Sequence, residues 1–338
     1  MTERITIRPF EARDIEGAST VLATRHRVVR ERFPMLPEAF EAPAATVEHF
    51  SFVLDIPGAS GVVAERGGRM VGFWLGFPMD DGYVLPKRHA LTLAPAHAVL
   101  PGEDADEAYH ALYGAVAGPW VARARLLHIV HIPAGDPTTA EAFGNLGFGR
   151  TNAYAVRDLS PLASEGARPR VEIRESTPED LEVVMRLSEA ERKFHSRPPI
   201  FEPYPGEADV ERVRERQRAN LSAEDSTHLI ASVDGREAGI LTLRTPLGSP
   251  LFTPAGSVYI AETGVLRSAR GTGVGTALLT RALDWAREHG HSHAALHFRR
   301  ANPISPGFWM GHGFVPVLEQ LERVIDDRAV WAQAEDED

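Results

Sequence analysis

The sequence predicts two tandem α/β domains, each built from a mixed, mostly antiparallel sheet flanked by helices. Two observations lead to this fold class. The chain has 338 residues, 43% hydrophobic and 25% charged, which is an ordinary globular composition at a length typical of two domains. The second half also repeats stretches of the first half at a nearly constant spacing, as duplicated domains do.

The repeat is visible in three pairs of stretches that are about 166 residues apart along the chain. They align Arg8 and Asp14 with Arg174 and Asp180, Gly68 and Gly72 with Gly235 and Gly239, and Phe148 with Phe314. Between the two copies lies a stretch rich in small residues, Pro and Gly, which is typical of a linker. We therefore predict a first domain over 1–160, a linker over 161–170, a second domain over 171–328 and an acidic tail over 329–338.

The elements of the second copy can be assigned in order, beginning with a strand at residue 171 where Val and Ile alternate with charged residues. Thr177, Pro178 and Asp180 then supply an N-cap, a first-turn proline and an acidic third position for a helix. A second, charged helix is predicted from about 208 to 221. Strands at 228–233 and 237–244 flank an Asp234-Gly235 turn and form a hairpin.

A third long strand is predicted over 257–265, followed by a glycine loop and a helix whose apolar residues recur at helical spacing. Residues 294–298 alternate as another strand, and a short helix begins after Asn302-Pro303 and ends in "GHGF". The predicted order is β-α-α-β-β-β-α-β-α-β, and the repeat implies the same order in the first copy.

Composition excludes several classes of function. The chain has no cysteine, so disulfides, thiolate metal sites and acyl-cysteine intermediates are excluded, and a reducing cytoplasm is the expected compartment. The charged N-terminus does not resemble a signal peptide, and no apolar run reaches membrane-spanning length. A net charge of −11 argues against nucleic-acid binding. The stretch "HGHSH" at 289–293 lacks acidic or cysteine companions, so we interpret it as a connector and predict no metal site.

The glycine loop "RGTGVG" at 270–275 lies between the third strand and the next helix. A helix N-terminus has free N–H groups and a partial positive charge, so it favours an anion, and Arg270 adds a fixed cation. A side chain at Gly273 or Gly275 would stand between these groups and the anion. A Walker loop would need a lysine, and a dinucleotide fingerprint would need a parallel unit in front of it. A plain turn is the remaining alternative.

The pattern Arg270-x-x-Gly273-x-Gly275 after a strand ending in Val265, together with "ANPISPGFWMGHGF" at 301–314, resembles the GNAT superfamily of N-acyltransferases. The resemblance implies an acyl-CoA site in which the third strand splays from the strand at 294–298 and the pantetheine arm enters the gap. It implies the following donor-binding residues: Gly264, Val265, Leu266, Arg270, Gly271, Thr272, Gly273, Val274, Gly275, Thr276, Asn302 and Trp309. The implied activity is transfer of an acetyl group from acetyl-CoA to a primary amine of a small molecule or peptide by direct attack.

Catalytic groups are less clearly indicated. Glu262 is an acid in an otherwise uncharged strand, where loss of hydration would raise its pKa toward that of a useful base, although it could equally face solvent. Tyr259 and His297 are weaker choices. Trp309 stands where many family members have a tyrosine acid, and an indole cannot donate a proton near neutral pH. Proton delivery would then fall to water, His312 or Ser305, with His312 also interpretable as an exposed helix end.

The first copy lacks the glycine loop. The repeat aligns Asp104 with Arg270, Glu107 with Gly273 and Tyr109 with Gly275. Carboxylates would repel a pyrophosphate and the tyrosine would obstruct it, so we predict a degenerate copy and one active site in the second domain. The degenerate copy could still form one wall of the acceptor pocket.

Several points stay open at this stage. A loop containing Arg197, Glu202 and Tyr204 is a candidate acceptor loop or an ordinary surface loop. A non-catalytic acyl-CoA sensor is the main alternative function, and O-acyl transfer is a weaker one. We expect no nucleic-acid or membrane partner, and either a monomer or a homodimer.

Overall fold

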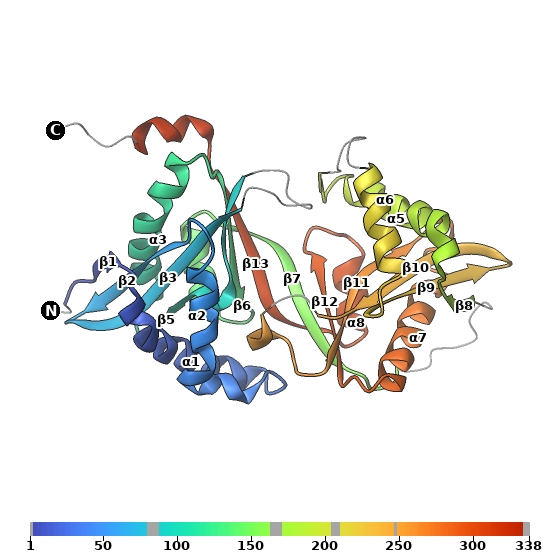
Figure 1. Cartoon of the computed structure of the whole chain (residues 1–338), viewed down its shortest axis with the longest axis horizontal. Helices are drawn as coiled ribbons and strands as arrows, with labels where there is room; N and C mark the ends of the chain where they lie inside the picture. Colours follow the sequence, from blue (N-terminus) through green and yellow to red (C-terminus); the bar gives the residue numbers. More distant parts are fainter. Residues whose placement is uncertain (1–2, 80–87, 163–170, 204–209, 247–248, 334–338) are drawn as a thin grey trace. The chain divides into compact units, whose positions relative to one another are not determined.

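The structure is a computed structural model that describes residues 3–79, 88–162, 171–203, 210–246 and 249–333 (Figure 1). The chain forms two compact units. The N-terminal unit comprises Met1–Ala153, Ser249–Phe252 and Val317–Asp338, and the C-terminal unit comprises Tyr154–Gly248 and Thr253–Pro316. Most of the expected linker, from residue 163 onward, lies outside the described residues. Among the described helices, none combines the length and hydrophobicity needed to cross a membrane.

The C-terminal unit has the element order that the sequence predicts. Its elements are β8 (Val171–Glu175), α5 (Leu181–His195), α6 (Val210–Leu221), β9 (Ser226–Val233), β10 (Arg236–Arg244), β11 (Ser257–Val265), α7 (Val274–Glu288), β12 (His293–Arg299) and α8 (Ser305–Gly311). The strands are ordered β12-β11-β10-β9-β8. β11 and β12 run parallel, whereas the other neighbours in this list are antiparallel. The predicted fold class is therefore confirmed.

The hairpin between β9 and β10 turns at the two residues that the sequence indicates. Asp234 has φ 51° and Gly235 has φ 71°, so both central residues are left-handed, as a type I′ turn requires. On the face of the sheet that α5 covers, Ile230 and Ile240 pack against Val184 and Leu187. This apolar contact fixes α5 over the strands that carry the candidate site.

The N-terminal unit repeats the same order. Its elements are β1 (Thr6–Pro9), α1 (Ile15–Arg32), α2 (Val47–Leu54), β2 (Ser60–Arg66), β3 (Arg69–Met79), β4 (His89–Thr92), β5 (His97–Val99), α3 (Ala105–Ala122), β6 (Leu127–Pro133) and α4 (Pro137–Asn145). It also contains the first half of β7 (Gly149–Asp158) and most of β13 (Val315–Val324). β1, β2, β3, β4, β6 and β13 are neighbours in that order, and β5 pairs with β3. The third long strand of the other copy is thus represented here by two short strands.

The last strand of the chain does not stay with the copy that precedes it. β13 pairs antiparallel with β6, from Leu318 opposite Pro133 to Val324 opposite Leu127. The compact units describe which segments pack together, whereas the domain boundaries predicted from the repeat describe which segments are duplicated. Those boundaries therefore stay a prediction. After β13, a short 3₁₀ helix (Asp327–Gln333) covers part of the predicted acidic tail.

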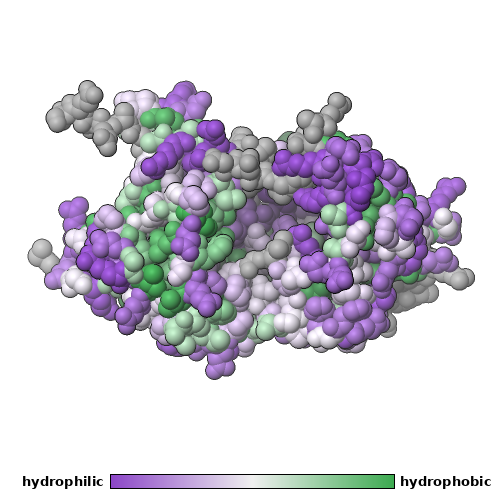
Figure 2. Space-filling view, viewed as in Figure 1, coloured by the Kyte–Doolittle hydropathy of each residue, from purple (hydrophilic) through white to green (hydrophobic). Residues whose placement is uncertain are grey.

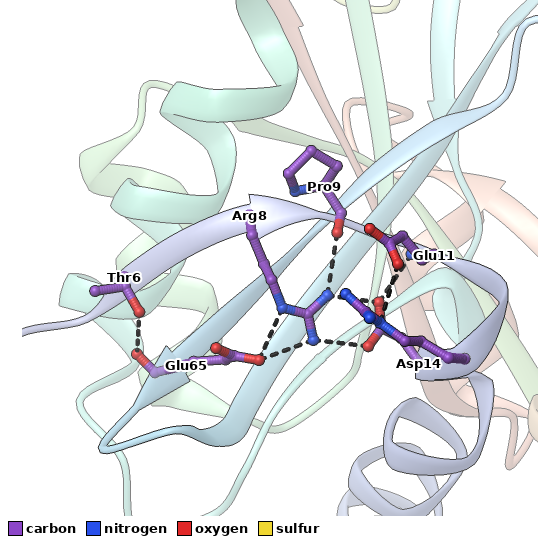
Figure 3. Close-up of polar contacts among 7 residues, drawn as sticks. Thr6, Arg8, Pro9, Glu11, Asp14 and Glu65 are labelled. Carbon is purple, nitrogen blue, oxygen red and sulfur yellow. Dashed lines mark hydrogen bonds and ion pairs between the residues drawn. The ribbon is translucent and has the colours of Figure 1, made fainter.

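The paired Arg and Asp residues of the repeat make the same contact in both units. Arg8 donates to both carboxylate oxygens of Asp14 at 2.7 Å, and Asp14 in turn accepts from the Glu11 N–H (Figure 3). Arg174 donates to Asp180 at 2.7 and 2.6 Å in the other unit. Each pair ties the first strand to the start of the first helix, so the two sequence matches report one structural device used twice.

The paired glycines also occupy equivalent positions. A Cβ on Gly239 would lie 2.9 Å from the Gly264 carbonyl oxygen and 3.1 Å from Leu278 Cδ1 of α7. A Cβ on Gly72 would lie 3.0 Å from the Ala98 carbonyl oxygen and 3.5 Å from Leu112 Cδ1 of α3. Both glycines therefore let the central helix pack closely on the sheet, which supports the alignment of Leu112 with Leu278.

Candidate functional site

β11 and β12 separate partway along their length. They pair from Ser257 opposite His293 to Ile260 opposite Leu296, whereas β11 continues to Val265 and β12 to Arg299. The register of β11 on β10 also shifts here, because Thr242 faces Glu262 and Leu243 faces Ile260. Ala261 is thus an extra residue in β11, a bulge of the kind that bends a strand away from its neighbour. The gap expected between these strands begins at this point.

The loop after β11 presents unpaired backbone donors. It runs through a 3₁₀ turn (Arg267–Ala269) to Gly271, with φ 77°, and Gly273, with φ 93°, which is the N-cap of α7. The backbone N–H groups of residues 271–276 donate to no backbone oxygen within the described part of the chain, whereas the N–H of Ala277 bonds the Gly273 carbonyl at 2.9 Å. A run of free N–H groups at a helix N-terminus is an anion site.

Arg270 supplies a cation at the same loop. Its Nε donates to the Val265 carbonyl at 3.1 Å, and its guanidinium carbon lies 4.1 Å from the centre of the Phe194 ring. Among the described residues, no carboxylate forms an ion pair with it. Burial and the nearby Arg267 lower its pKa, although an arginine stays charged at neutral pH. A guanidinium held in place without a carboxylate is suited to a phosphate group.

Gly275 has a different role from the one that the sequence suggested. A Cβ at this position would point to Phe308 of α8, 3.4 and 3.5 Å from two of its ring carbons. These are ordinary contact distances, and the Cβ would therefore point at α8. The neighbouring Thr276 hydroxyl lies 3.3 Å from His312 Nε2, while His312 Nδ1 donates to the Phe308 carbonyl at 2.7 Å. His312 is therefore a half-buried residue that links α8 to α7.

Glu262 lies on β11 directly after the bulge, where α5 and α6 cover the sheet. Its Oε2 is 3.5 Å from Gln217 Nε2 of α6. Burial raises the pKa of Glu262, and the charge of Glu191 raises it further, against hydrogen bonds from Ser188 and Gln217 and the charge of Arg192. A raised pKa makes a carboxylate a stronger base than a solvated glutamate, and the role of Glu262 as the base stays a prediction.

An ionisable group near Glu262 joins Glu202 of the candidate acceptor loop to Glu191, His195 and Arg299, which the sequence patterns had not indicated. His195 Nδ1 lies 3.0 Å from Glu191 and 3.3 Å from Glu202, which also accepts from Arg299 at 2.8 Å. Burial lowers the pKa of His195, but the two carboxylates raise it by more. Burial raises the pKa of Glu202, but His195 and Arg299 outweigh this and lower it to about 2. Glu191 and His195 are four residues apart on α5, a spacing that the sequence does show.

Asn302 connects this group to α8. Its carbonyl oxygen accepts from the N–H groups of Ile304 and Ser305 at 2.9 and 3.1 Å, which holds the start of α8. Its amide nitrogen is then directed at His195 Nε2, 3.2 Å away. An amide donor at this nitrogen favours the neutral imidazole with its proton on Nδ1, whereas the carboxylates favour the charged ring.

The remaining candidates lie in packed surroundings. Trp309 is buried, with ring centres 4.8 Å from Phe308 and 5.3 Å from Phe314. The Tyr259 hydroxyl lies 2.5 Å from His297 Nδ1, and the two rings are stacked. Tyr204 lies outside the described residues.

Hydrophilic side chains gather over α5 and α6 on the face shown in Figure 2. Beneath this surface Val213 and Gln217 of α6 are buried. The helix that reads as charged in the sequence is therefore solvated on one side and contributes an amide to the Glu262 site on the other.

Comparison with known proteins agrees with this geometry. Residues 190–314 match the model of the Acetyltransferase (GNAT) family. A GCN5-related N-acetyltransferase from Sphaerobacter thermophilus is 15% identical and aligns over 95% of this chain and 96% of its own, with a TM-score of 0.55. The glucosamine N-acetyltransferase region of a fungal multi-domain β-N-acetylglucosaminidase is 14% identical, with a TM-score of 0.56 over 95% of this chain and 38% of that one.

A tandem GNAT protein from the clavulanic acid biosynthesis pathway is 17% identical and aligns over 95% of this chain and 98% of its own, with a TM-score of 0.49. No curated protein matched the sequence. At these identities the first two structures establish the fold, and the family model accounts for the part of the chain that carries the loop and Glu262. The C-terminal unit belongs to the acetyltransferase (GNAT) family, and the N-terminal unit repeats its fold.

Proposed function

We propose that this protein is an N-acetyltransferase that moves an acetyl group from acetyl-CoA to a primary amine by direct attack, with a single active site in the C-terminal unit. The observation that carries this proposal is the set of free N–H groups at 271–276, which follow the end of β11. β11 separates from β12 and carries Glu262, whose pKa is raised. Family membership supports acyl transfer in general, and the site residues support the finer assignment.

The residues at the loop fit the donor. Free N–H groups and Arg270 match a pyrophosphate, which needs several donors and a cation. The Leu266 N–H bonds the Ala238 carbonyl on β10 at 2.8 Å, so the adjacent Val265 turns its backbone groups away from β10, toward the gap. Of these groups the Val265 carbonyl already accepts from Arg270. We propose that residues 264–266 and 270–276 hold the donor, while Asn302 and Trp309 shape the site from α8.

In this reaction a neutral amine attacks the acetyl carbon of the acetyl-CoA thioester, the carbon–sulfur bond breaks, and CoA leaves as the thiolate, which water protonates. Glu262 accepts the proton that the amine must lose, since burial and Glu191 raise its pKa and make it a better base. The Ser188 hydroxyl and the Gln217 amide orient its carboxylate. His312 already keeps a proton on Nδ1 for the Phe308 carbonyl and faces the Thr276 hydroxyl with Nε2. We therefore assign no proton donation to His312.

Features of the N-terminal unit support a single site. There, residues 104–107, which align with the glycine loop, form the N-cap and first turn of α3, and the Asp104 carboxylate accepts from the Glu107 N–H. A cavity of about 580 Å³ at this turn is lined by acidic side chains, including Glu103 and Glu141. Such a surface repels a pyrophosphate.

The gap of the N-terminal unit is also filled from within. Arg25, which the repeat aligns with Glu191, is buried and donates to the carbonyls of His97 and Ala94 at 2.6 Å. His97 Nε2 lies 2.8 Å from the His131 carbonyl on β6, and the buried Tyr109 hydroxyl lies 3.1 Å from His97 Nδ1. These side chains occupy the position where the other unit leaves β11 and β12 apart.

Calorimetric titration of acetyl-CoA into the full chain tests the proposal. We expect one site per chain, loss of binding in Arg270→Glu, and unchanged binding in Arg236→Glu, which makes the same charge change on an exposed residue of β10. Two sites would contradict the assignment of a silent N-terminal unit. Binding of acetyl-CoA without CoA release from any amine in a broad panel would favour a non-catalytic sensor.

A further inference from the structure

Within the residues that the structure describes, Arg244 at the end of β10 has no carboxylate partner. It is partly buried, and its Nε has no hydrogen-bond partner among the same residues. Its guanidinium carbon lies 5.8 Å from the centre of the Tyr259 ring. Arg299 and Arg174 of the same unit are, by contrast, paired with Glu202 and Asp180. A buried guanidinium donor without an acceptor is costly, and this cost is offset where a ligand supplies the acceptor.

The fold places Arg244 on the same face of the sheet as Glu262. Thr242 and Arg244 are two residues apart on β10 and so share a face, and their partners on β11 are Glu262 and Tyr259. The bulge at Ala261 allows Glu262 and Tyr259, which are three residues apart, to lie on this common face. Diagonal neighbours on adjacent strands have their Cβ atoms roughly 7 Å apart, so one small molecule can reach both Arg244 and Glu262.

The Thr242 hydroxyl and both ring nitrogens of His228 extend this polar face. His228, Thr242 and Glu262 are directly opposite one another on β9, β10 and β11. Thr242 and His228 are both buried, and their polar side-chain atoms have no hydrogen-bond partner among the described residues. The face therefore holds several unused donors and acceptors close to the candidate base, which an apolar packing surface would not need.

The donor approaches Glu262 from the opposite end of β11. The glycine loop follows Val265, whereas Tyr259 and Arg244 lie on the other side of Glu262 along the strand. The region over Arg244 is thus left to the acceptor. One guanidinium with a free edge matches one planar carboxylate, which it can bind through two parallel hydrogen bonds.

We propose that the acceptor is an aminocarboxylate, with its amine at Glu262 and its carboxylate at Arg244. This inference rests on the proposed function and narrows it to acceptors of the amino-acid class. Tyr259, held by its hydrogen bond with His297, supports the guanidinium from one side. The acidic pole at Glu262 and Glu191 and the cationic pole at Arg244 together select a molecule that carries both charges.

The test compares free L-amino acids with the matching L-amino-acid amides, which keep the amine and lose the carboxylate. For the wild-type chain we expect kcat/KM to be at least about tenfold higher for the acids, as for a lost charged hydrogen bond. In Arg244→Gln the ratio of kcat/KM for acids to kcat/KM for amides falls to about one, while the KM for acetyl-CoA stays unchanged. Arg236→Gln, on the same strand, keeps the wild-type preference.

Two further measurements keep the outcomes distinct. Arg244→Lys retains the charge without the planar fork and should give an intermediate preference, which provides a second variant if Arg244→Gln does not fold. Calorimetry of L-amino acids with CoA present measures the carboxylate site without turnover. CoA release with equal use of acids and amides, or a preference that survives in folded Arg244→Gln, would overturn the inference. Arg244-dependent binding without any CoA release would instead overturn the proposed function and leave the carboxylate site standing.

Discussion

Gly273 and Gly275 look alike in the sequence, yet the structure predicts opposite results when each is replaced by alanine. Gly273 is the N-cap of α7 with φ 93°, a conformation that costs a residue with a Cβ about 1–3 kcal/mol. Gly275 is the second residue of α7, and a Cβ there would meet Phe308 at 3.4 Å, an ordinary contact. Alanine also favours a helix over glycine by up to about 1 kcal/mol.

We therefore expect Gly273→Ala to lower the thermal unfolding midpoint by roughly 2–6 °C and Gly275→Ala to leave it unchanged or raise it. The effect on acetyl-CoA follows the same division. In Gly273→Ala the loop either keeps its strain or turns its N–H groups away from the anion, so affinity should fall by about tenfold or more, since about 1.4 kcal/mol corresponds to a factor of ten. In Gly275→Ala the N–H groups keep their direction, and affinity should stay within about threefold of wild type.

Differential scanning calorimetry and titration of acetyl-CoA, applied to both variants, measure these two quantities. The matched pair removes general effects of a glycine-to-alanine change. Equal loss of affinity in both folded variants would refute the reasoning, because it would mean that a Cβ at residue 275 obstructs the anion as one at residue 273 does. Loss of acetyl-CoA affinity in Gly275→Ala alone would also refute the conclusion that a Cβ at residue 275 points to Phe308.

Two further predictions concern the base and the duplicated core. Glu262→Gln should lower kcat by about 10²- to 10⁴-fold without changing acetyl-CoA affinity. In the wild type, kcat/KM should decline as pH falls through the raised pKa of Glu262, since only the deprotonated carboxylate accepts a proton. Profiles of kcat/KM against pH for both proteins measure this, and an unchanged decline at low pH in Glu262→Gln would rule Glu262 out as the base. Gly72→Ala and Gly239→Ala should each destabilise the fold by about 1–3 kcal/mol, because a Cβ would stand 3.0 and 2.9 Å from a backbone oxygen. Chemical denaturation measures the free energy of unfolding of each variant. Gly235→Ala is the control that separates backbone strain from crowding, because no atom lies within 4 Å of its Cβ but its φ is positive.

Local patterns in the sequence were enough to predict the elements of the C-terminal unit. β11 spans Ser257–Val265 as predicted, and the Asp234-Gly235 turn has the φ values that such a pair favours. These features depend on neighbours along the chain. The repeat added longer-range information, because Arg174 and Asp180 could be recognised as a pair only beside Arg8 and Asp14.

The parts of the site that the sequence did not reveal arise from contacts between distant segments. Nothing in the strand "VYIAETGV" shows that Ala261 is a bulge, and without the bulge Tyr259 and Glu262 would be assigned to opposite faces. Likewise, the effect of Glu191 on Glu262 depends on the packing of α5 over β11. The contact that a Cβ at residue 275 would make depends on Phe308 of α8, which lies some thirty residues further along the chain.

The two copies show how one fold supports either an open or a closed gap. Arg25 and Glu191 are equivalent in the repeat, yet Arg25 bonds carbonyls of its own unit and closes the gap, whereas Glu191 leaves it open and places a negative charge beside Glu262. Tyr109 and Gly275 are also equivalent in the repeat, yet the tyrosine fills its unit with a buried ring, whereas Gly275 brings α7 close to Phe308 of α8. The N-terminal unit thus gains buried hydrogen bonds and packing at this position, and the C-terminal unit keeps the unpaired N–H groups that we propose bind the donor.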